Sequence, residues 1–373
     1  MSSYSGPIVD VDVHHTWGSS RDLMEYLPRQ WHEYSLGSSA GGPLNLLPNM
    51  DNINMVGNYI RGELIQADGR SPGSKYEVMR RTLLDRLGIT RLMLNYDVGL
   101  ESAYYNPYFA AALCAGANQW SADHWLSLPD DRVWGSVLVP TELAEEGAAE
   151  VRKWAGGPRV GQVLMVGNPM AKPFGHPHYH PIYAAAAEAG LPIAVHVGGE
   201  KATKSAYTAG GHAGSYFERK ATGNQAGMHH LTSFITHGVF EKFPALKVLI
   251  TEYGYSWLPP LVWRLDSIFG LLRAECPLVK RLPSEYVRDH IRMSTQPLDS
   301  TRTPQIIESF PDFEHVLCFS TDFPHFDGDE PRQLANKVPR EWLPKVYYQN
   351  AADFYGWKPA TLEDNARALS MAG

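Results

Sequence analysis

The sequence predicts an α/β fold of the (β/α)8 barrel class. The first observation is a unit that repeats along the chain, in which a short apolar run precedes a stretch with helical periodicity. The second is that eight such runs occur over 373 residues, and a barrel of this class needs eight strands and about 250 residues plus insertions. The third is that three apolar runs end in a potential metal ligand, where parallel α/β folds carry their chemistry.

Each apolar run is expected to form a buried strand. The eight strands are expected at residues 8–13, 91–95, 133–139, 160–166, 193–197, 248–252, 291–294 and 316–320. Helices are expected at 107–126 and 142–154, at 182–188 with Gly190 as C-cap, and in a stretch that reaches Phe243 and stops at Pro244. A doubly wound open sheet is the alternative, but no glycine-rich phosphate loop follows the first strand.

The whole chain, residues 1–373, is expected to form one barrel domain with a cap insertion and a long loop. The cap insertion covers residues 18–85, between the first two strands, and residues 199–225 follow the fifth strand. Both leave from the carboxyl ends of strands, so they are expected to lie over the active-site mouth. The first is interpreted as a lid and the second as a substrate loop.

Composition excludes several classes of function. A net charge of −7, with no lysine- or arginine-rich run, argues against a nucleic-acid surface. Three scattered cysteines without a CxxC spacing are typical of a reduced intracellular protein. The amino terminus has no basic segment followed by an apolar one, and no apolar stretch is long enough to span a bilayer. A cytoplasmic protein that acts on a small molecule is expected.

Four polar side chains at the ends of predicted strands suit a divalent metal. Asp12 and His14 are two residues apart in a strand, so both face the barrel interior, where a metal would compensate for their burial. His196 ends the fifth strand and Asp322 follows the eighth. Taken singly, His196 is a core histidine and Asp322 a helix N-cap; their common position at strand ends favours a metal with an open coordination position. Asp10, on the same face, either orients the ligands or is a paired structural group.

Other side chains near these strand ends are candidates for catalysis and substrate binding. Glu252 ends the sixth strand and is either a general acid/base, with a pKa raised by burial, or the partner of Arg264 in a structural clamp. Tyr253 and Trp257 either form the wall of the substrate site or pack in the core, and Arg264 is a third candidate for substrate binding. His325, three residues after Asp322, is a candidate substrate-binding or proton-relay group.

These motifs resemble the amidohydrolase superfamily, in its type 2 branch related to aminocarboxymuconate semialdehyde decarboxylase. The resemblance covers nearly the whole chain and rests on residues 12–14, 191–196, 238–244, 252–254, 257–259, 263–266, 320–325 and 350–352. It implies one Zn2+ or Mn2+ bound by Asp12, His14, His196 and Asp322, and a dimer or tetramer. The lysine that bridges two metals in binuclear relatives would come from the fourth strand, but residues 160–167 contain none.

Two positions depart from the pattern of the family. The first ligand pair is Asp-x-His instead of His-x-His, which shifts preference towards harder ions such as Mn2+. The decarboxylases of the family carry a proton-delivering histidine at the end of the sixth strand, where this chain has Glu252. This departure weakens the decarboxylase assignment, and His237 and His325 are the candidates to replace that histidine.

Three functions are compared. The first is hydrolysis of an amide, a lactone or a carbon–carbon bond beside a ketone, by a water whose pKa the metal lowers towards ~7 and whose proton Asp322 takes. The second is non-oxidative decarboxylation of an aromatic or dienoic acid, in which Asp322 protonates the ring carbon. The third is a barrel that only binds, against which the intact ligand set argues. In the second function, an arginine of the cap insertion would bind the substrate carboxylate; the alternative for each such arginine is a solvated surface side chain. The candidates are Arg61, Arg70, Arg80 and Arg81.

Overall fold

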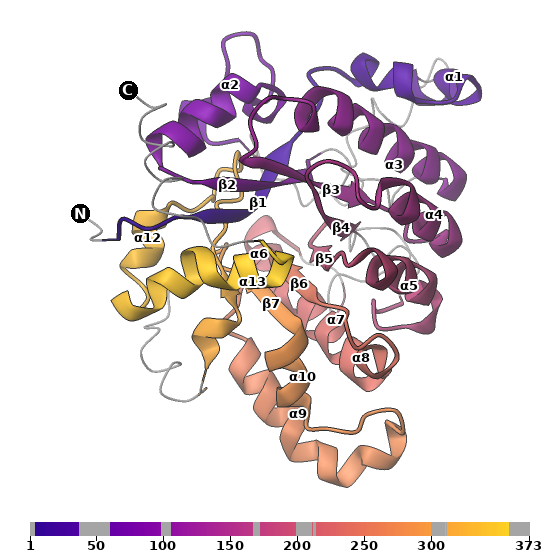
Figure 1. Cartoon of the computed structure of the whole chain (residues 1–373), viewed down its shortest axis with the longest axis vertical. Helices are drawn as coiled ribbons and strands as arrows, with labels where there is room; N and C mark the ends of the chain where they lie inside the picture. The colour runs from indigo at the N-terminus through magenta and orange to yellow at the C-terminus, as the bar shows by residue number, and fades with distance from the viewer. Residues whose placement is uncertain are drawn as a thin grey trace.

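Eight parallel strands form one sheet in the order β1 to β8 (Figure 1). The computed structural model describes residues 4–36, 60–97, 106–166, 172–198, 211, 214–299, 310 and 312–357. The strands are β1 (Val9–His15), β2 (Arg91–Tyr96), β3 (Val133–Leu138), β4 (Val160–Val166), β5 (Ile193–His196), β6 (Val248–Thr251), β7 (Ile291–Ser294) and β8 (Leu317–Cys318). Each expected apolar run is therefore a strand.

The barrel is nearly closed by hydrogen bonds between β1 and the residues that follow β8. β8 is shorter than the run that predicted it, because the chain after Cys318 leaves β7 and continues along β1. There the Val11 amide donates to the Phe319 carbonyl at 3.0 Å, and the His14 amide donates to the Phe323 carbonyl at 2.7 Å. The architecture is the predicted (β/α)8 barrel, nearly closed.

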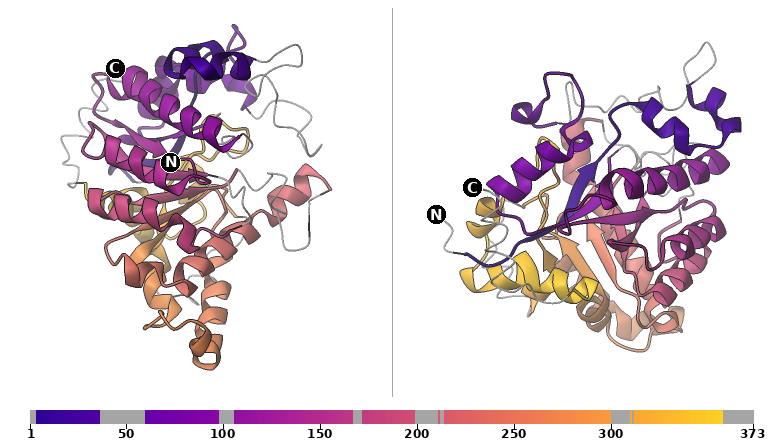
Figure 2. Two further views of the ribbon diagram at one scale, coloured as in Figure 1. Left: turned by 90° about the vertical axis from the view of Figure 1, so that its right-hand side faces the viewer. Right: turned by 45° about the horizontal axis from the view of Figure 1, so that its top comes forward.

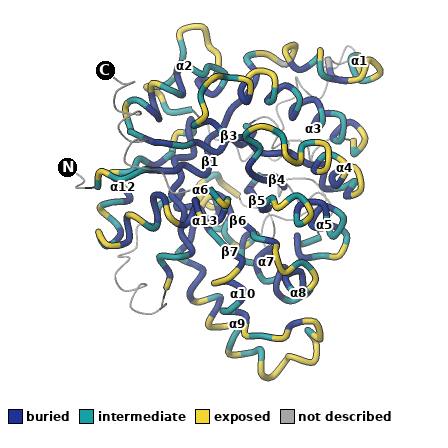
Figure 3. The backbone as a smooth tube through the Cα atoms, viewed as in Figure 1, coloured by how far each residue is buried: buried dark blue, intermediate teal, exposed yellow. Residues whose placement is uncertain are grey.

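Helices cover the outside of the barrel, and the strands are its buried centre (Figures 2 and 3). α4 and α5 pack side by side, and α3 packs on β3. The helices of the described residues are α1 (His32–Leu36), α2 (Tyr76–Met79), α3 (Pro107–Ser121), α4 (Ala144–Trp154), α5 (His180–Ala189), α6 (Tyr216–Thr222), α7 (Asn224–Thr236), α8 (Val239–Lys242), α9 (Leu258–Leu272), α10 (Pro283–His290), α12 (Pro331–Ala335) and α13 (Asn350–Tyr355). In this described part, no helix is long and apolar enough to cross a membrane.

The helix expected to reach Phe243 is interrupted. It forms as α7 and α8, which are separated at Gly238, whose φ is +69°. A β-carbon at Gly238 would lie 2.4 Å from the Cβ of Leu278, so only glycine fits there without a shift. By contrast, Gly190 adopts the predicted left-handed C-cap of α5, with φ at +67°.

The described ends of both insertions lie at the carboxyl ends of the strands. The Arg61 amide donates to the Pro324 carbonyl at 3.1 Å, and Ile60 forms an antiparallel bridge with His325. In the second insertion, α6 brings Lys220 to Glu252. The remaining parts of the two predicted segments, residues 37–59, 199–210 and 212–213, lie outside the described residues.

Candidate metal centre

The barrel brings the four predicted ligands together. Asp12 and His14 lie on β1, His196 is the last residue of β5, and Asp322 follows β8. His14 Nε2 lies 3.0 Å from Asp322 Oδ1 and 3.5 Å from Asp12 Oδ1, and His196 Nε2 lies 3.4 Å from Asp12 Oδ2. All four side chains are fully buried.

Each of the four side chains has a buried polar atom without a hydrogen-bond partner. These atoms are Asp12 Oδ2, His14 Nε2, His196 Nε2 and Asp322 Oδ2. A buried polar atom left unpaired costs about 1–3 kcal/mol, so four such atoms in one place need a compensating group. The possible ligand atoms of Asp12, His14 and His196 lie within 4.8 Å of one another, as do those of His14, Glu252, Asp322 and His325. The two groups share His14, and their carboxylate oxygens and imidazole nitrogens suit a divalent cation. The residues present therefore fit the metal that the family resemblance implies.

The backbone prepares both histidines to bind through Nε2. His14 Nδ1 lies 3.3 Å from the Tyr96 carbonyl, and His196 Nδ1 lies 2.6 Å from the Val197 carbonyl. A carbonyl can only accept, so each Nδ1 carries the proton and each Nε2 offers its lone pair in the neutral ring. This orientation of ligands by their other nitrogen is typical of metal sites.

Asp322 is linked to a second carboxylate through His325. His325 Nδ1 lies 2.6 Å from Asp322 Oδ1, and His325 Nε2 lies 3.6 Å from Asp97 Oδ1. Burial would lower the pKa of His325, but the two carboxylates raise that pKa well above its ordinary value. Burial would likewise raise the pKa of Asp322, yet His325 and His14 hold it well below its usual range. His325 is therefore a protonated bridge between two ionised carboxylates.

The pair of His196 and Asp12 shows the same balance. Burial works against the charge on His196, but the adjacent Asp12 carboxylate outweighs it and raises the pKa of His196 to about 9. Burial would raise the pKa of Asp12, but His196 and His14 lower it. A cation that binds here displaces the proton of His196, so binding is expected to weaken as the pH falls.

Glu252 faces the cluster and pairs with Lys220, whereas the clamp considered from the sequence would have used Arg264. Its Oε2 lies 3.7 Å from His196 Nε2, and its Oε1 accepts from Lys220 Nζ at 3.0 Å. Lys220 Nζ also lies 2.7 Å from Asp327 Oδ2. Burial and the charge of Asp322 raise the pKa of Glu252. Its position fits the predicted acid/base candidate.

The three predicted substrate-binding residues lie apart from this cluster. Arg264 is exposed on α9, and the clamp with Glu252 is replaced by the Lys220 pair. Tyr253 is buried against α7, where a β-carbon on Gly227 would lie 2.7 Å from its ring. The Trp257 indole donates to the Tyr253 carbonyl at 2.9 Å. Tyr253 and Trp257 thus occupy positions typical of packing residues.

Asp10 connects β1 to the loop that carries Asp322. Its carboxylate accepts from Thr321 Oγ1 at 2.6 Å, from the Thr321 amide at 3.0 Å and from the Asp12 amide at 3.2 Å. Burial raises the pKa of Asp10 to about 8, although these hydrogen bonds oppose the shift. Asp10 therefore positions two segments that carry predicted ligands.

A cavity of about 260 Å³ is lined by Asp97, whose Oδ1 lies 3.6 Å from His325 Nε2. Asp97 forms one wall, and the other walls belong to the cap insertion, with the apolar side chains of Ile60 and Ile65 and the guanidinium of Arg70. Its volume lies just below the ~300–1,000 Å³ that encloses a drug-sized ligand, so it fits a compound with a single ring.

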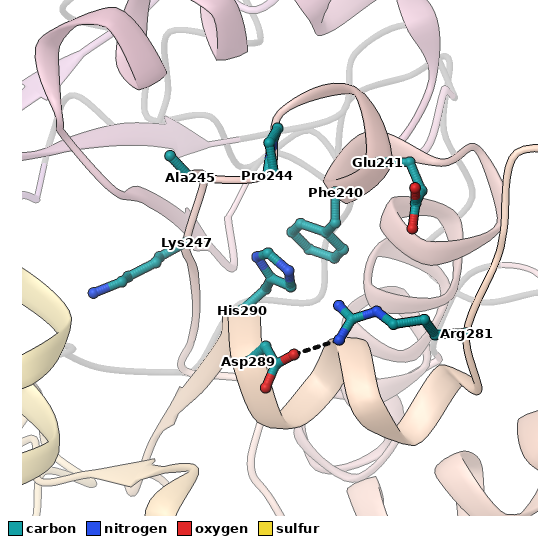
Figure 4. A pocket seen from close by; sticks show the side chains of 8 residues that line it. All are labelled: Phe240, Glu241, Pro244, Ala245, Lys247, Arg281, Asp289 and His290. Carbon is teal, nitrogen blue, oxygen red and sulfur yellow. Dashed lines mark hydrogen bonds and ion pairs between the residues drawn. The ribbon is translucent and has the colours of Figure 1, made fainter.

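A second cavity, of about 580 Å³, lies at the opposite end of the barrel (Figure 4). It is lined by Lys247, which precedes β6, and by His290, which precedes β7. Two of its charged residues, Arg281 and Asp289, form an ion pair at 2.6 Å. Barrel enzymes carry their chemistry at the carboxyl ends of the strands, so this cavity is not the candidate active site.

Three residues near the cluster were not predicted from the sequence. Asn95 interrupts the apolar run of β2, and Asp97 directly follows it, so the strand-end rule could have found both. Lys220 gives no such signal, because it comes from a helix far from any strand end in the sequence.

Comparison with known proteins defines the class. The family model described as Amidohydrolase matches residues 9–357, so the chain belongs to the amidohydrolase family, in its type 2 branch, as the motifs predicted. The family is one of metal-dependent enzymes. A comparison with curated proteins gives no match.

Several solved structures share the fold. An amidohydrolase, map2389c, from Mycobacterium avium subsp. paratuberculosis K-10 has a TM-score of 0.74 at 19% identity, covering 95% of this chain and 100% of that one. 5-Carboxyvanillate decarboxylase LigW from Sphingomonas paucimobilis has a TM-score of 0.62 at 17% identity, over 94% and 99% of the two chains. A dihydroxybenzoic acid decarboxylase from Polaromonas sp. JS666, with bound manganese and 2-nitroresorcinol, has a TM-score of 0.62 at 17% identity, over 96% and 99%.

Proposed function

We propose that this protein is a metal-dependent, non-oxidative decarboxylase of an aromatic acid, a carbon–carbon lyase. The observation that carries the proposal is the set of four unpartnered buried atoms on Asp12, His14, His196 and Asp322. The decarboxylases among the structural neighbours, one of them with manganese bound, support decarboxylation over hydrolysis.

The four side chains named above would hold one divalent ion, Mn2+ or Zn2+. When bound, the ion supplies a Lewis acid that neutralises the carboxylate and an adjacent phenolic oxygen of the substrate. The two carboxylates in the donor set favour Mn2+ over softer ions.

Asp322 and His325 would manage the proton of the reaction. The bond between the ring carbon and the carboxylate breaks, the electron pair stays on the ring carbon, and that carbon takes a proton as CO2 leaves. Because His325 carries the proton and Asp322 is ionised, Asp322 would pass the proton of His325 to the ring carbon; His325 Nδ1 lies 2.6 Å from Asp322 Oδ1. Asp97, on the far side of His325, would keep that imidazolium charged and oriented.

The cavity lined by Asp97 would hold the aromatic ring. Ile60 and Ile65 offer apolar walls, and Arg70 offers a guanidinium for a second anionic or phenolic substituent. No ion pair of Arg70 is found among the described residues, in contrast to Arg61, which pairs with Glu63 at 2.7 Å. Of the four cap arginines Arg61, Arg70, Arg80 and Arg81, Arg70 is therefore the best candidate to bind this second substituent.

Hydrolysis is the second candidate, and Glu252 is the observation that favours it. A carboxylate 3.7 Å from His196 Nε2 is placed to accept a proton from an attacking water, and its raised pKa suits that task. Decarboxylation requires another proton donor in place of the strand-six histidine, and His325 fills that role in the proposal.

The test is a product assay on the metal-loaded protein. Protein loaded with Mn2+ is incubated with 2,6-dihydroxybenzoate, 5-carboxyvanillate and related acids in D2O, and with a panel of amides and lactones. We expect loss of CO2 from at least one acid, with deuterium at the carbon that carried the carboxylate.

Two variants sharpen this assay. Asp322→Asn removes the proposed proton donor and is expected to lower kcat by at least ~100-fold, the range for one general acid. Arg264→Met, on the exposed face of α9, is the matched control and should retain full activity. Hydrolysis of an amide or lactone, with every acid left intact, would contradict the decarboxylase assignment.

A further inference from the structure

A chain of hydrogen bonds crosses the inside of the barrel from α13 to Asp12. Tyr355 Oη donates to Gln162 Oε1 at 2.8 Å, and Gln162 Nε2 donates to Asn95 Oδ1 at 3.0 Å. Asn95 Nδ2 then donates to Asp12 Oδ1 at 2.7 Å. Asp12, Asn95 and Gln162 are fully buried, on β1, β2 and β4. Four elements distant in sequence thus share one polar chain.

All the hydrogen bonds in this series donate in the same direction, from Tyr355 towards Asp12. The Gln162 amide donates to Asn95 Oδ1 and, at 2.9 Å, to Ser136 Oγ, so its oxygen must face the Tyr355 hydroxyl. Because Asn95 Oδ1 accepts from Gln162, the Asn95 amide group must face Asp12. The ionised carboxylate of Asp12 can only accept. Each side chain therefore fixes the orientation of the next, and the last donor points at a proposed metal ligand.

We propose that Asn95 is a positioning residue for Asp12, and that Gln162 and Tyr355 hold Asn95 in place. The Asn95 bond occupies Asp12 Oδ1, and Oδ2 is the oxygen without a partner. The bond also opposes rotation of the carboxylate, so Oδ2 stays directed towards His196. This inference rests on the metal site of the proposed function and extends it to residues that touch neither metal nor substrate.

The expected effect is on metal affinity. Loss of a group that hydrogen-bonds a metal ligand weakens binding by about 10–100-fold. Asn95→Leu keeps the size of the side chain and removes its donor, so we expect at least a ~10-fold weaker affinity for Mn2+. Tyr355→Phe removes one hydroxyl two links away, and we expect about threefold, the lower end of what one hydrogen bond contributes.

The test is calorimetric titration of Mn2+ into chelator-stripped protein, together with the electron paramagnetic resonance spectrum of bound Mn2+. Asn118→Leu and Tyr183→Phe are matched controls, because both residues are buried and hydrogen-bonded on the helices outside the sheet. Asn118 donates to the Leu138 carbonyl at 2.9 Å, and Tyr183 donates to the Phe174 carbonyl. Both controls should lose thermal stability but keep the parent affinity and spectrum.

Each outcome decides the inference. Folded Asn95→Leu protein with the parent affinity and spectrum overturns it, as does an equal loss of affinity in Asn118→Leu. If Asn95→Leu fails to fold, Gln162→Met and Tyr355→Phe carry the test, and unchanged affinity in both overturns the inference. A parent protein that binds no Mn2+ overturns the metal centre itself, so the two failures are distinguishable.

Discussion

Lys220 places an ammonium group between two carboxylates at the mouth of the barrel. It contacts Glu252 at 3.0 Å and Asp327 at 2.7 Å; burial would lower the pKa of Lys220, but the two carboxylates outweigh it and raise that pKa. The pair holds Glu252 Oε1, so Oε2 is the oxygen that faces His196. Lys220 thus fixes the carboxylate that stands where the family's decarboxylases carry a histidine.

Replacement of Lys220 is expected to impair catalysis. Lys220→Met leaves Glu252 without its donor, and a hydrogen bond to a charged group contributes about 1.5–3 kcal/mol, so we expect kcat to fall by about 10–100-fold. Lys220→Arg should restore part of the activity. Lys280→Met is the control, because Lys280 forms a similar ion pair with Glu241 at 2.7 Å on the exposed surface. Full kcat in Lys220→Met would remove Lys220 from the site.

His230 makes the stability of the fold depend on pH. It is buried and neutral, because its Nδ1 accepts from the Phe174 amide at 3.2 Å, and burial lowers its pKa from 6.5 to about 3. As the pH falls below 6.5, His230 binds a proton in the unfolded chain but stays neutral in the folded protein. The contribution of neutral His230 to the free energy of unfolding is therefore complete above pH 6.5 and is lost on acidification.

A matched pair of variants tests this dependence. Between pH 7 and pH 5 the parent should lose ~2 kcal/mol of unfolding free energy through this one residue. His230→Asn keeps a hydrogen-bond acceptor and cannot titrate. Its loss of unfolding free energy between the two pH values should therefore be smaller than that of the parent by ~2 kcal/mol. His229→Asn, at an exposed neighbouring position, should behave like the parent. Denaturant unfolding at pH 7 and pH 5 measures the free energy of unfolding of each protein. An equal loss between the two pH values in the parent and in His230→Asn would contradict the prediction.

At the scale of elements, the break between α7 and α8 depends on one glycine. Gly238 has a left-handed conformation and lies against Leu278, whereas Gly88 has φ at +68° and open space, with no atom within 4 Å, where a β-carbon would stand. Gly88→Ala should lower the free energy of unfolding by only ~1–2 kcal/mol, the cost of holding an alanine in the left-handed conformation. Gly238→Ala adds a steric clash, so its melting temperature should fall further. Equal melting temperatures would show that Leu278 moves away freely.

The short β8 also matters for the site. Only Leu317–Cys318 form the strand, and the following residues bond to β1 instead of β7. The Asp322 amide donates to the Asp12 carbonyl at 3.1 Å. The end of the last strand is thus used to bring one proposed ligand beside another.

At the scale of the whole molecule, the barrel brings together buried polar atoms of Asp12, His14, His196 and Asp322 that have no hydrogen-bond partner among the described residues. Stability should therefore depend on metal. At a Mn2+ concentration 100-fold above Kd, binding adds ~2.7 kcal/mol to the free energy of unfolding, and chelator should reverse this gain. Thermal melts with Mn2+, with chelator and with Mg2+ as a comparison ion check the prediction. Identical melting temperatures in all three would contradict the metal centre.

The sequence by itself was enough to predict the eight strands and the four converging side chains. Apolar runs identify buried strands, parallel strands end at the same edge, and Asp12, His14, His196 and Asp322 all stand at such ends. Local pattern also identified Gly190 as a helix C-cap. The sequence left open whether Glu252 pairs with Arg264, because spacing along the chain does not tell which cation reaches Glu252 in space; in the structure that cation is Lys220.

Only the tertiary structure decided which groups meet from different elements. Lys220 reaches Glu252 from a helix after β5, and Asp97 reaches His325 across the mouth from β2. Asn95 and Gln162 join inside the barrel from strands 67 residues apart. Periodicity describes what one element buries, whereas these contacts depend on how strands and loops are packed around a closed barrel.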